Sequence, residues 1–440
     1  MSQTLYRYRV WCTTDLTYEY VWGTTTPTVC PVEGGPIDAN STSIVQSMEP
    51  NTVSVDNFQK SSFGELAVSN LTPILQLSFA YNNHPQLVNT AVTGSGTITN
   101  TDHMGVVSTG AAINSTANMG SKIPIKYRPG QGIISRFSAM FTPGVVGSTQ
   151  MIGIFDSDGI GFGYDGADFG LFHLIGGTIA WIHQTNWNLD KMDGTGPSGA
   201  NINFGNSKGN VFEVKFQFLG FGGLSFFVEN PGTADFVKVH VIGYSNTAVV
   251  PNFEIPSFPL CIKVENTTNN TDIIVKSASM MGGVEGKIVY YGPQFTDIWN
   301  TLTVQKNIET FIVGWQVKTT FQSYSSKILA YGTKITMSTG RNDRAQILRL
   351  YKNSTFTSPV WTDISSSQSV VQKLTSGTWN NDGSLMTQQI IPGKSDLFQQ
   401  VFDISNTSLY GSPGENLIIT LEGIEGSGSS TGSLSWLEDQ

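Results

Sequence analysis

The chain has 440 residues, and charged residues make up 13% of them, about half of the usual share in soluble domains. The formal net charge is −9 and no run of five or six Lys or Arg occurs, which argues against nucleic-acid binding. No apolar run approaches the roughly 18 residues of a membrane-spanning helix. The first residues lack the pattern of a signal peptide, so we expect synthesis in a cytoplasm. The 47 Gly and 11% aromatic residues, with many Ser, Thr and Asn, favour turns and strands and predict an all-β protein.

The first part of the chain, 1–60, is expected to be a small separate β module with a linker. Segments 5–12 and 18–23 have the pattern of two strands joined by a polar turn. A Gly- and Pro-containing stretch at 34–40 then interrupts the chain. Segment 43–60 is polar and weakly patterned, which predicts a linker or an extended arm.

The second part, 61–286, is expected to be an antiparallel β-sandwich of jelly-roll type. Segment 212–218 alternates strictly between apolar and polar residues, which places three Phe and one Val on a buried face. Gly-rich turns lead from it into strands at 224–228 and 236–244, which predicts a meander. The remaining expected strands are 74–81, 133–141, 150–155, 169–176, 179–186, 260–266 and 273–280. About ten strands suit two packed sheets.

The third part, 287–440, repeats this style and is expected to form a second β-sandwich. Strand patterns occur at 310–321, 327–337, 346–351 and 417–422. The final run, 432–440, also alternates, so we expect it to be paired in a sheet. No heptad pattern is present, which excludes a long coiled coil within this sequence.

Cysteines and histidines give little sign of chemistry. Three cysteines, Cys12, Cys30 and Cys261, form no CxxC spacing, and we expect buried free thiols. A bridge between Cys12 and Cys30 is the alternative, since sequence does not place their Cα atoms. The five histidines form no HxH or HExxH motif, so a metal or catalytic site on them is not expected.

One acidic, Gly-rich segment, 155–168, is a candidate ion site. It carries four carboxylates that could ligate calcium: Asp156, Asp158, Asp165 and Asp168. It lacks the downstream Glu of a recognised calcium loop, and tight turns explain the same residues. We therefore expect no cofactor, with calcium as the alternative.

Carboxylates for glycoside hydrolysis can also be named, namely Asp190 and Asp193 with Glu213 and Glu229. Two carboxylates at a suitable separation are the core of that chemistry. No local motif marks these four among the 33 acidic residues, and no GxSxG elbow or activated cysteine occurs. The expectation is a protein without a catalytic site.

Tryptophans among amide side chains suggest a different role. Trp181 and Trp187 stand in a segment rich in Asn, Gln and Thr, and Trp379 has similar neighbours. A ring face flanked by amides is suited to stacking on a sugar and hydrogen bonding its hydroxyls. We nevertheless favour the interpretation that these rings fill a sandwich edge or a subunit interface, where aromatic residues are enriched, and sugar stacking is the alternative.

Several segments resemble virion structural and appendage proteins (fibre, minor capsid or decoration type) of tailed phages and large double-stranded DNA viruses. The N-terminal marks are YRVWCTTD at 8–15 and YVWGTTTPTVCP at 20–31. Others are FGEL at 63–66, PILQL at 73–77, YRPGQG at 127–132 and FLGFG at 218–222. GENLIIT at 414–420 and LSWLEDQ at 434–440 are similar to the ends of such proteins.

This resemblance implies a non-enzymatic virion subunit, made in the host cytoplasm and assembling as a homo-oligomer, often a trimer. It implies that the N-terminal module attaches to other virion proteins through residues of the two N-terminal marks: Trp11, Cys12, Trp22, Pro27 and Cys30. A virion protein that binds a host-surface glycan through Trp181 or Trp187 is the alternative, and a glycan-degrading enzyme is the third hypothesis. Fold alone does not decide among them, because β-sandwiches serve all three roles.

Overall fold

The computed structural model describes residues 5–32, 34–48, 70–288, 290–339, 344–393, 398–401 and 409–439. Among them, every pairing between named strands is antiparallel, which confirms the all-β prediction. A three-residue 3-10 turn, η2 (Gln184–Asn186), is their sole helical element. No helix in these ranges is long and apolar enough to cross a membrane. The chain divides into two compact units, Met1–Ser69 and Asn70–Gln440.

The first unit contains a three-stranded sheet with the order β2-β1-β3. Its strands are β1 (Leu5–Cys12), β2 (Thr17–Gly23) and β3 (Ile37–Met48). On β1, Tyr8, Val10 and Cys12 are buried, because alternate residues of a strand share one face. Residues 43–48, expected in a linker, instead pair with β1, while 49–60 lie outside the described residues.

A disulfide joins Cys12 to Cys30, with their Cα atoms 5.4 Å apart. The expectation of free thiols was therefore wrong for this pair and correct for Cys261, which is buried and unbridged. Strand pairing brings the two cysteines together, because the polar turn after β1 returns the chain as β2 and the loop after β2 carries Cys30 back to the end of β1. Sequence spacing alone does not show that return.

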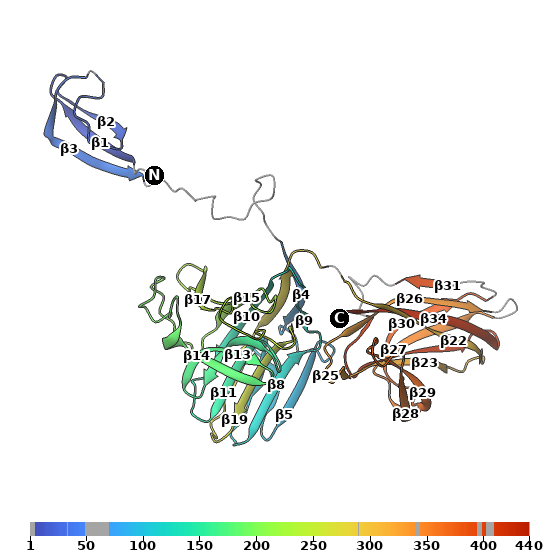
Figure 1. Ribbon diagram of the computed structural model, residues 1–440. Coiled ribbons are helices and arrows are strands. Elements are labelled where there is room, and N and C mark those ends of the chain that lie inside the picture. The colour runs from blue at the N-terminus through green and yellow to red at the C-terminus, as the bar shows by residue number, and fades with distance from the viewer. Residues whose placement is uncertain are drawn as a thin grey trace. The chain divides into compact units, whose positions relative to one another are not determined.

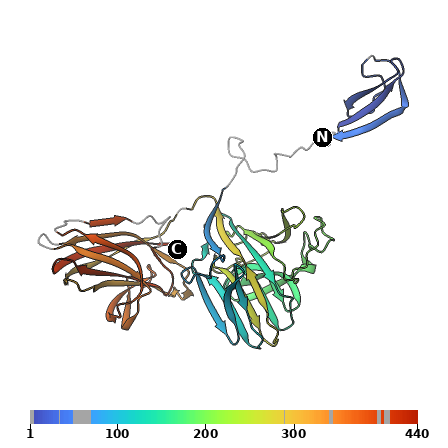
Figure 2. The ribbon, with the colours of Figure 1, turned by 180° about the vertical axis from the view of Figure 1, so that it is seen from behind.

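The second unit begins with a sandwich of two large sheets (Figure 1, Figure 2). Its nine-stranded sheet has the order β17-β16-β15-β10-β20-β7-β6, with β21 beside β10 and β4 beside β21. Its seven-stranded sheet has the order β14-β13-β12-β11-β19-β8-β5. The strands of the first sheet are β4 (Leu71–Ser78), β6 (Thr97–Thr101), β7 (Met104–Ser108), β10 (Ile133–Phe141), β15 (Asn210–Phe216), β16 (Leu224–Glu229), β17 (Phe236–Ile242), β20 (Ile274–Ser277) and β21 (Ser279–Glu285). Those of the second are β5 (Val88–Thr93), β8 (Ser115–Ser121), β11 (Ser148–Phe155), β12 (Gly159–Asp165), β13 (Asp168–Ile175), β14 (Thr178–His183) and β19 (Leu260–Asn266). A two-stranded ribbon, β9 (Ile125–Lys126) with β18 (Ser257–Phe258), accompanies them.

Alternation along the strands builds the core of this sandwich. Phe212, Val214 and Phe216 on β15 are buried, as the period-two pattern predicts. Phe162 on β12 reaches Phe212 from the opposite sheet, with ring centroids 4.7 Å apart. Both rings are fully buried, and side chains of this size contribute about 1.5–3 kcal/mol each when they leave water. Aromatic packing between the sheets therefore supplies much of the stability.

The rest of the second unit is another sandwich of antiparallel strands, as predicted for the third part of the chain. A five-stranded sheet has the order β22-β34-β26-β31, with β32 also beside β26. A six-stranded sheet has the order β28-β29-β23-β33-β27-β30, and a short hairpin joins β24 to β25. The bounds are β22 (Gln294–Val304), β23 (Thr310–Val317), β24 (Thr320–Phe321), β25 (Tyr324–Ser325), β26 (Leu329–Thr339), β27 (Gln346–Lys352), β28 (Phe356–Asp363), β29 (Val371–Trp379), β30 (Ser384–Ile391), β31 (Phe398–Val401), β32 (Tyr410–Gly411), β33 (Asn416–Gly423) and β34 (Gly428–Asp439). The final strand, β34, lies between β22 and β26, which confirms that it is paired.

Polar and aromatic contacts join the two sandwiches. Arg128 and Lys126, at the β9 end of the first sandwich, both bind the carboxylate of Asp439 at the end of β34. Tyr290 packs on Tyr331 of β26 with ring centroids 5.0 Å apart. These contacts hold the end of the second sandwich against the ribbon of the first.

Candidate functional site

A polar pocket of about 400 Å³ opens at one edge of the seven-stranded sheet. Its walls come from the β12–β13 hairpin, from the end of β14 with η2, and from the loop that follows η2. The polar residues that line it are Tyr164, Asp168, His183, Gln184, Thr185, Asp193, Asn201 and Asn203. No Lys or Arg is among the described residues that line it.

The floor of this polar pocket is aromatic. Phe169 on β13 and Phe204 in the loop stack at 4.1 Å between ring centroids, with 14° between their planes. Tyr164 packs against Phe169 at 5.1 Å, and burial raises the pKa of its hydroxyl to about 12. This phenol therefore keeps its proton at neutral pH and remains a hydrogen-bond donor.

Asp190 holds the loop of the pocket in shape. It is buried, and its two carboxylate oxygens accept hydrogen bonds from the backbone amides of Met192 and Ser198, each at 2.8 Å. Backbone bonds from Gly194 to Ala200 then close the loop on itself. Asp190, named above as a candidate for glycoside hydrolysis, therefore uses both carboxylate oxygens to stabilise the backbone of this loop.

Asp193 presents a charged acceptor to the pocket. Its Oδ1 accepts hydrogen bonds from the Thr195 hydroxyl at 2.6 Å and the Thr195 amide at 2.9 Å. These bonds lower the pKa of Asp193, because they favour the ionised carboxylate. Asp193 is thus suited to accepting hydrogen bonds, and unsuited to the general-acid role, which needs a raised pKa.

The two candidate tryptophans have different surroundings. Trp187 is only 3% exposed, and its ring packs on Phe162, Phe169 and Phe204 while its indole nitrogen donates to the Ile182 carbonyl at 3.3 Å. It supports the pocket floor from within the core and does not line the pocket, which contradicts the hypothesis that this ring stacks on a sugar. Trp181 is partly exposed and packs on Phe172 at 5.4 Å. It lies two residues before His183 on β14, on the same face of the sheet.

The four aspartates proposed for calcium do not gather at one point. Asp156 and Asp158 flank the β11–β12 turn, while Asp165 and Asp168 flank the β12–β13 turn at the other end of β12. Asp158 is buried and accepts hydrogen bonds from the amides of Gly176 and Glu254. Asp156 pairs with Lys327 and Asp165 with His183. The hypothesis of a single calcium ion bound by all four aspartates is therefore wrong, because the length of strand β12 separates the two pairs.

The other proposed carboxylates are also apart. Glu213 lies on β15 in the opposite sheet, where it is buried in ion pairs with Arg136 and Lys215. Glu229 ends β16 in that sheet. They do not form a hydrolytic pair with Asp193 at the pocket.

The residues proposed for attachment are distributed over the first unit. Trp11 on β1 packs edge-on against Tyr18 of β2 at 4.8 Å. Trp22 is exposed at the end of β2, while Pro27 is partly exposed in the loop leading to Cys30. On the face that carries Trp11, the guanidinium of Arg9 lies over the ring of Tyr18 and that of Arg7 over Tyr20. This sheet face therefore carries a ladder of arginine and aromatic side chains, in which Tyr18, Tyr20 and Trp22 are exposed and Arg7, Arg9 and Trp11 are partly exposed.

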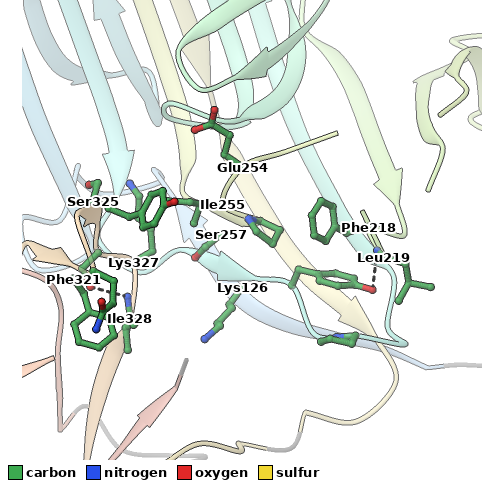
Figure 3. Close-up of a pocket in the computed structure, with 16 residues that line it drawn as sticks. Lys126, Phe218, Leu219, Glu254, Ile255, Ser257, Phe321, Ser325, Lys327 and Ile328 are labelled. Carbon is green, nitrogen blue, oxygen red and sulfur yellow. Dashed lines mark hydrogen bonds between the residues drawn. The ribbon is translucent and has the colours of Figure 1, made fainter. Parts of the chain in front are cut away.

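A second hollow, the apolar cavity, has about 610 Å³ and lies in the second unit (Figure 3). Phe218 and Leu219 form one side, and Phe321 and Ile328 the other. The Tyr127 hydroxyl accepts a hydrogen bond from the Leu219 amide at 3.2 Å, which fixes the loop after β15 beside the ribbon. The sequence did not indicate this cavity, because its walls come from segments far apart in the chain.

Comparisons with known proteins give distant structural similarities. No family model matches the chain, and no curated protein matches it. Lectin UEA-II complexed with galactose is 10% identical with a TM-score of 0.31, over 48% of this chain and 99% of the lectin. Lectin I-B4 from Griffonia simplicifolia, in a metal-free form, is 9% identical with a TM-score of 0.32 over the same shares. A beta-1,3-glucanase from Mycobacterium marinum is 10% identical with a TM-score of 0.32, over 48% of this chain and 98% of the enzyme.

Proposed function

We propose that the chain is a non-catalytic glycan-binding protein and that the polar pocket holds the sugar. The observation that carries this proposal is the rim of carboxylate and amide groups around a hollow of this size, above a buried aromatic base of Phe169 and Phe204, which are 7% and 2% exposed. A sugar ring has apolar C–H faces and polar hydroxyl edges, so it needs both kinds of surface. Binding sites of this volume use a few placed polar groups for orientation and an apolar wall for affinity.

The charges of the pocket favour neutral or amino sugars over acidic ones. Asp168 and Asp193 carry negative charge at the rim, and no Lys or Arg lines the described part of the pocket to balance them. A sialic or uronic acid would place a like charge beside these carboxylates, which opposes binding. A protonated amino sugar would instead gain charge-assisted hydrogen bonds.

A glycan array carrying neutral, amino and acidic sugars tests this proposal with the full chain. We expect selective binding to neutral or amino sugars, and calorimetry on the best ligand should give a single site. Asp168→Asn and Asp193→Asn should each weaken it about tenfold, the usual effect of losing a hydrogen bond to a charged group. Asp235→Asn, an exposed carboxylate next to β17, is the matched control and should change nothing.

Two outcomes would contradict the proposal. An array with no bound glycan at high protein concentration removes it. If both pocket variants keep the affinity of the unaltered protein, the glycan binds outside the polar pocket. The partly exposed Trp181 would then be the next residue to replace. Measurable turnover of the bound glycan would contradict the non-catalytic part of the proposal.

We also propose that this chain is a subunit of a virus particle, as a homotrimer anchored by its N-terminal unit. The resemblance of its N-terminal segments to virion proteins supports this proposal. The compact first unit, with its ladder of Arg7, Arg9, Trp11, Tyr18, Tyr20 and Trp22, supplies a surface suited to attachment. Arginine and aromatic residues are enriched at protein interfaces. Light scattering on the purified chain should give the mass of a trimer, and a stable monomer would contradict that assembly.

A further inference from the structure

The apolar cavity is built to hold something other than a sugar. Its described lining is dominated by hydrocarbon and aromatic surface, contributed by Tyr127, Phe218, Leu219, Phe321, Tyr324 and Ile328. Leu219 is 63% and Tyr324 67% exposed, so two large apolar side chains stand open to solvent at its walls. The lining also includes polar side chains, namely Lys126, Glu254, Ser257, Gln322, Ser325, Ser326 and Lys327, but its exposed surface is mainly apolar. An apolar ligand fits this lining better than a polar one.

A smaller hollow of about 310 Å³, the basic cavity, adjoins the apolar cavity and shares Lys126, Tyr127 and Pro129 with it. Arg128 and Lys287 also line the basic cavity, and its described lining contains no Asp or Glu. The basic cavity therefore places three cationic side chains, Lys126, Arg128 and Lys287, beside the apolar chamber. A fourth cation, Lys327, lines the apolar cavity itself and is paired with Asp156.

One described carboxylate, Asp439, binds both Lys126 and Arg128, so the formal charges of these three side chains sum to +1. Lys287 adds a further positive charge. Burial lowers the pKa of Lys126 to about 8, so its ammonium is still mainly protonated at neutral pH. Glu254 belongs to the apolar cavity, but Figure 3 shows its carboxylate directed away from Lys126, at the opposite end. In a chain of net charge −9, this is a local excess of positive charge.

From this juxtaposition we infer that the two hollows form one binding site for an amphipathic anion, an apolar chain with a single carboxylate or phosphate head group. The apolar part lies between Phe218 and Phe321, and the head group reaches Lys126 and Lys287. The combined hollow is large enough for a ligand of drug-like or short-lipid size.

Calorimetric titration of the full chain with decanoate, decyl phosphate and decanol tests the inference below the micelle concentrations of the probes. We expect saturable binding of at least one anion with a one-to-one ratio, and decanol binding weaker by about fivefold or more, since it lacks the charge. A preference between the two anions identifies the head group. Equal affinity for decanol and for both anions would overturn the assignment of the basic cavity, and no binding of any probe would overturn the whole site.

Variants at exposed positions separate the two halves of the site without touching the core. Lys287→Gln should lower the affinity for the two anions by up to about fivefold and leave the affinity for decanol unchanged. The double variant Leu219→Asn with Tyr324→Ser should lower the affinity for all three probes by about tenfold or more. Asn suits position 219, because Leu219 has a positive φ of 36°.

Controls for these variants are Lys208→Gln and Val249→Asn, which replace an exposed lysine and an exposed valine that line neither cavity. Both should bind like the unaltered protein. If the cavity variants and the controls bind alike, the ligand occupies another place and the inference fails.

Discussion

The guanidinium of Arg128 forms two parallel hydrogen bonds with the carboxylate of Asp439, Nη1 to Oδ1 at 3.2 Å and Nη2 to Oδ2 at 2.8 Å. Arg128 follows the ribbon of the first sandwich and Asp439 ends the final strand of the second. The Asp439 side chain is 4% exposed, and Lys126 donates to its backbone carbonyl as well. A bidentate arginine–carboxylate pair of this kind fixes both the distance between the two side chains and their relative orientation. It ties the two sandwiches of the second unit together.

Replacing Asp439 should therefore destabilise the second unit. Asp439→Ala leaves Lys126 and Arg128 partly buried without their carboxylate, and such a loss costs about 3–5 kcal/mol. Calorimetric unfolding should show a lower melting temperature of the second unit, or separate transitions for its two sandwiches. Glu425→Gln is the matched control, because its pair with Arg344 is exposed on both sides and contributes less than about 1 kcal/mol. Equal melting temperatures for the Asp439→Ala and Glu425→Gln variants would contradict a stabilising role of Asp439.

Trp187→Ala should lower stability strongly. The ring fills the space among Phe162, Phe169 and Phe204, and removing a buried aromatic side chain costs about 3–5 kcal/mol. Denaturant unfolding followed by circular dichroism measures the loss. Trp181→Ala is the comparison, and its partly exposed ring should cost less. If Trp187→Ala kept full stability and lost glycan binding, direct stacking on the ligand would be restored as its role.

Breaking the disulfide should destabilise the first unit alone. The bridge joins residues that are 18 positions apart in the sequence. The double variant Cys12→Ser with Cys30→Ser removes this restriction on the unfolded chain, which should lower the free energy of unfolding by about 3 kcal/mol. Hydrogen exchange should rise across β1 and β2, while the second unit keeps its protection. A reductant should reproduce the effect in the unaltered protein. Unchanged exchange in β1 would show that the sheet is stable without the bridge.

Acidification should weaken the first sandwich through His173. This side chain is buried on β13, with Nε2 at 2.7 Å from the Asn252 carbonyl and Nδ1 at 3.0 Å from the Tyr244 hydroxyl. Burial lowers its pKa below the ordinary 6.5, although the Asn252 bond and the Asp158 charge oppose the shift. Below pH 6.5 the unfolded chain binds a proton that the folded chain resists, so the free energy of unfolding falls as the pH falls.

The measurement is the free energy of unfolding at several values between pH 7.5 and about pH 5. His173→Gln should flatten part of the decrease, because it removes one titrating group. His240, whose pKa burial also lowers, should account for a remaining slope. A slope identical in the variant and the unaltered protein would contradict the assignment to His173.

Local patterning predicted many of the strands and the pairing of neighbouring hairpin strands, but it missed other strands, among them β5, β8, β12 and β29. The bounds expected for β10 and β19 are those observed, and both strands alternate between buried and partly buried residues after three consecutive buried ones. The expected strand at 273–280 is instead two, β20 and β21, since the chain changes partner around Ala278. That change depends on β7 and β4, which lie far away in sequence.

The candidate site was only partly predictable for the same reason. Residues of the Asn- and Gln-rich segment before Trp187, among them Gln184 and Thr185, border the polar pocket. The stacking residue was misassigned, because only the folded core shows that Trp187 points inward. Phe169 and Phe204, which form the floor, come from a strand and a loop that no local motif connects. The paired Cys12 and Cys30 likewise became evident only once β1 and β2 were in register.

The position of β34 has a kinetic consequence. This strand fills the gap between β22 and β26, and its partners β22 and β26 come before it in the chain by long intervals. Closing such long loops is entropically costly and slows folding. Until β34 inserts, one edge each of β22 and β26 remains unpaired, and unpaired edges invite association with other chains. We therefore expect refolding of this sandwich to be slow and its yield to fall as protein concentration rises.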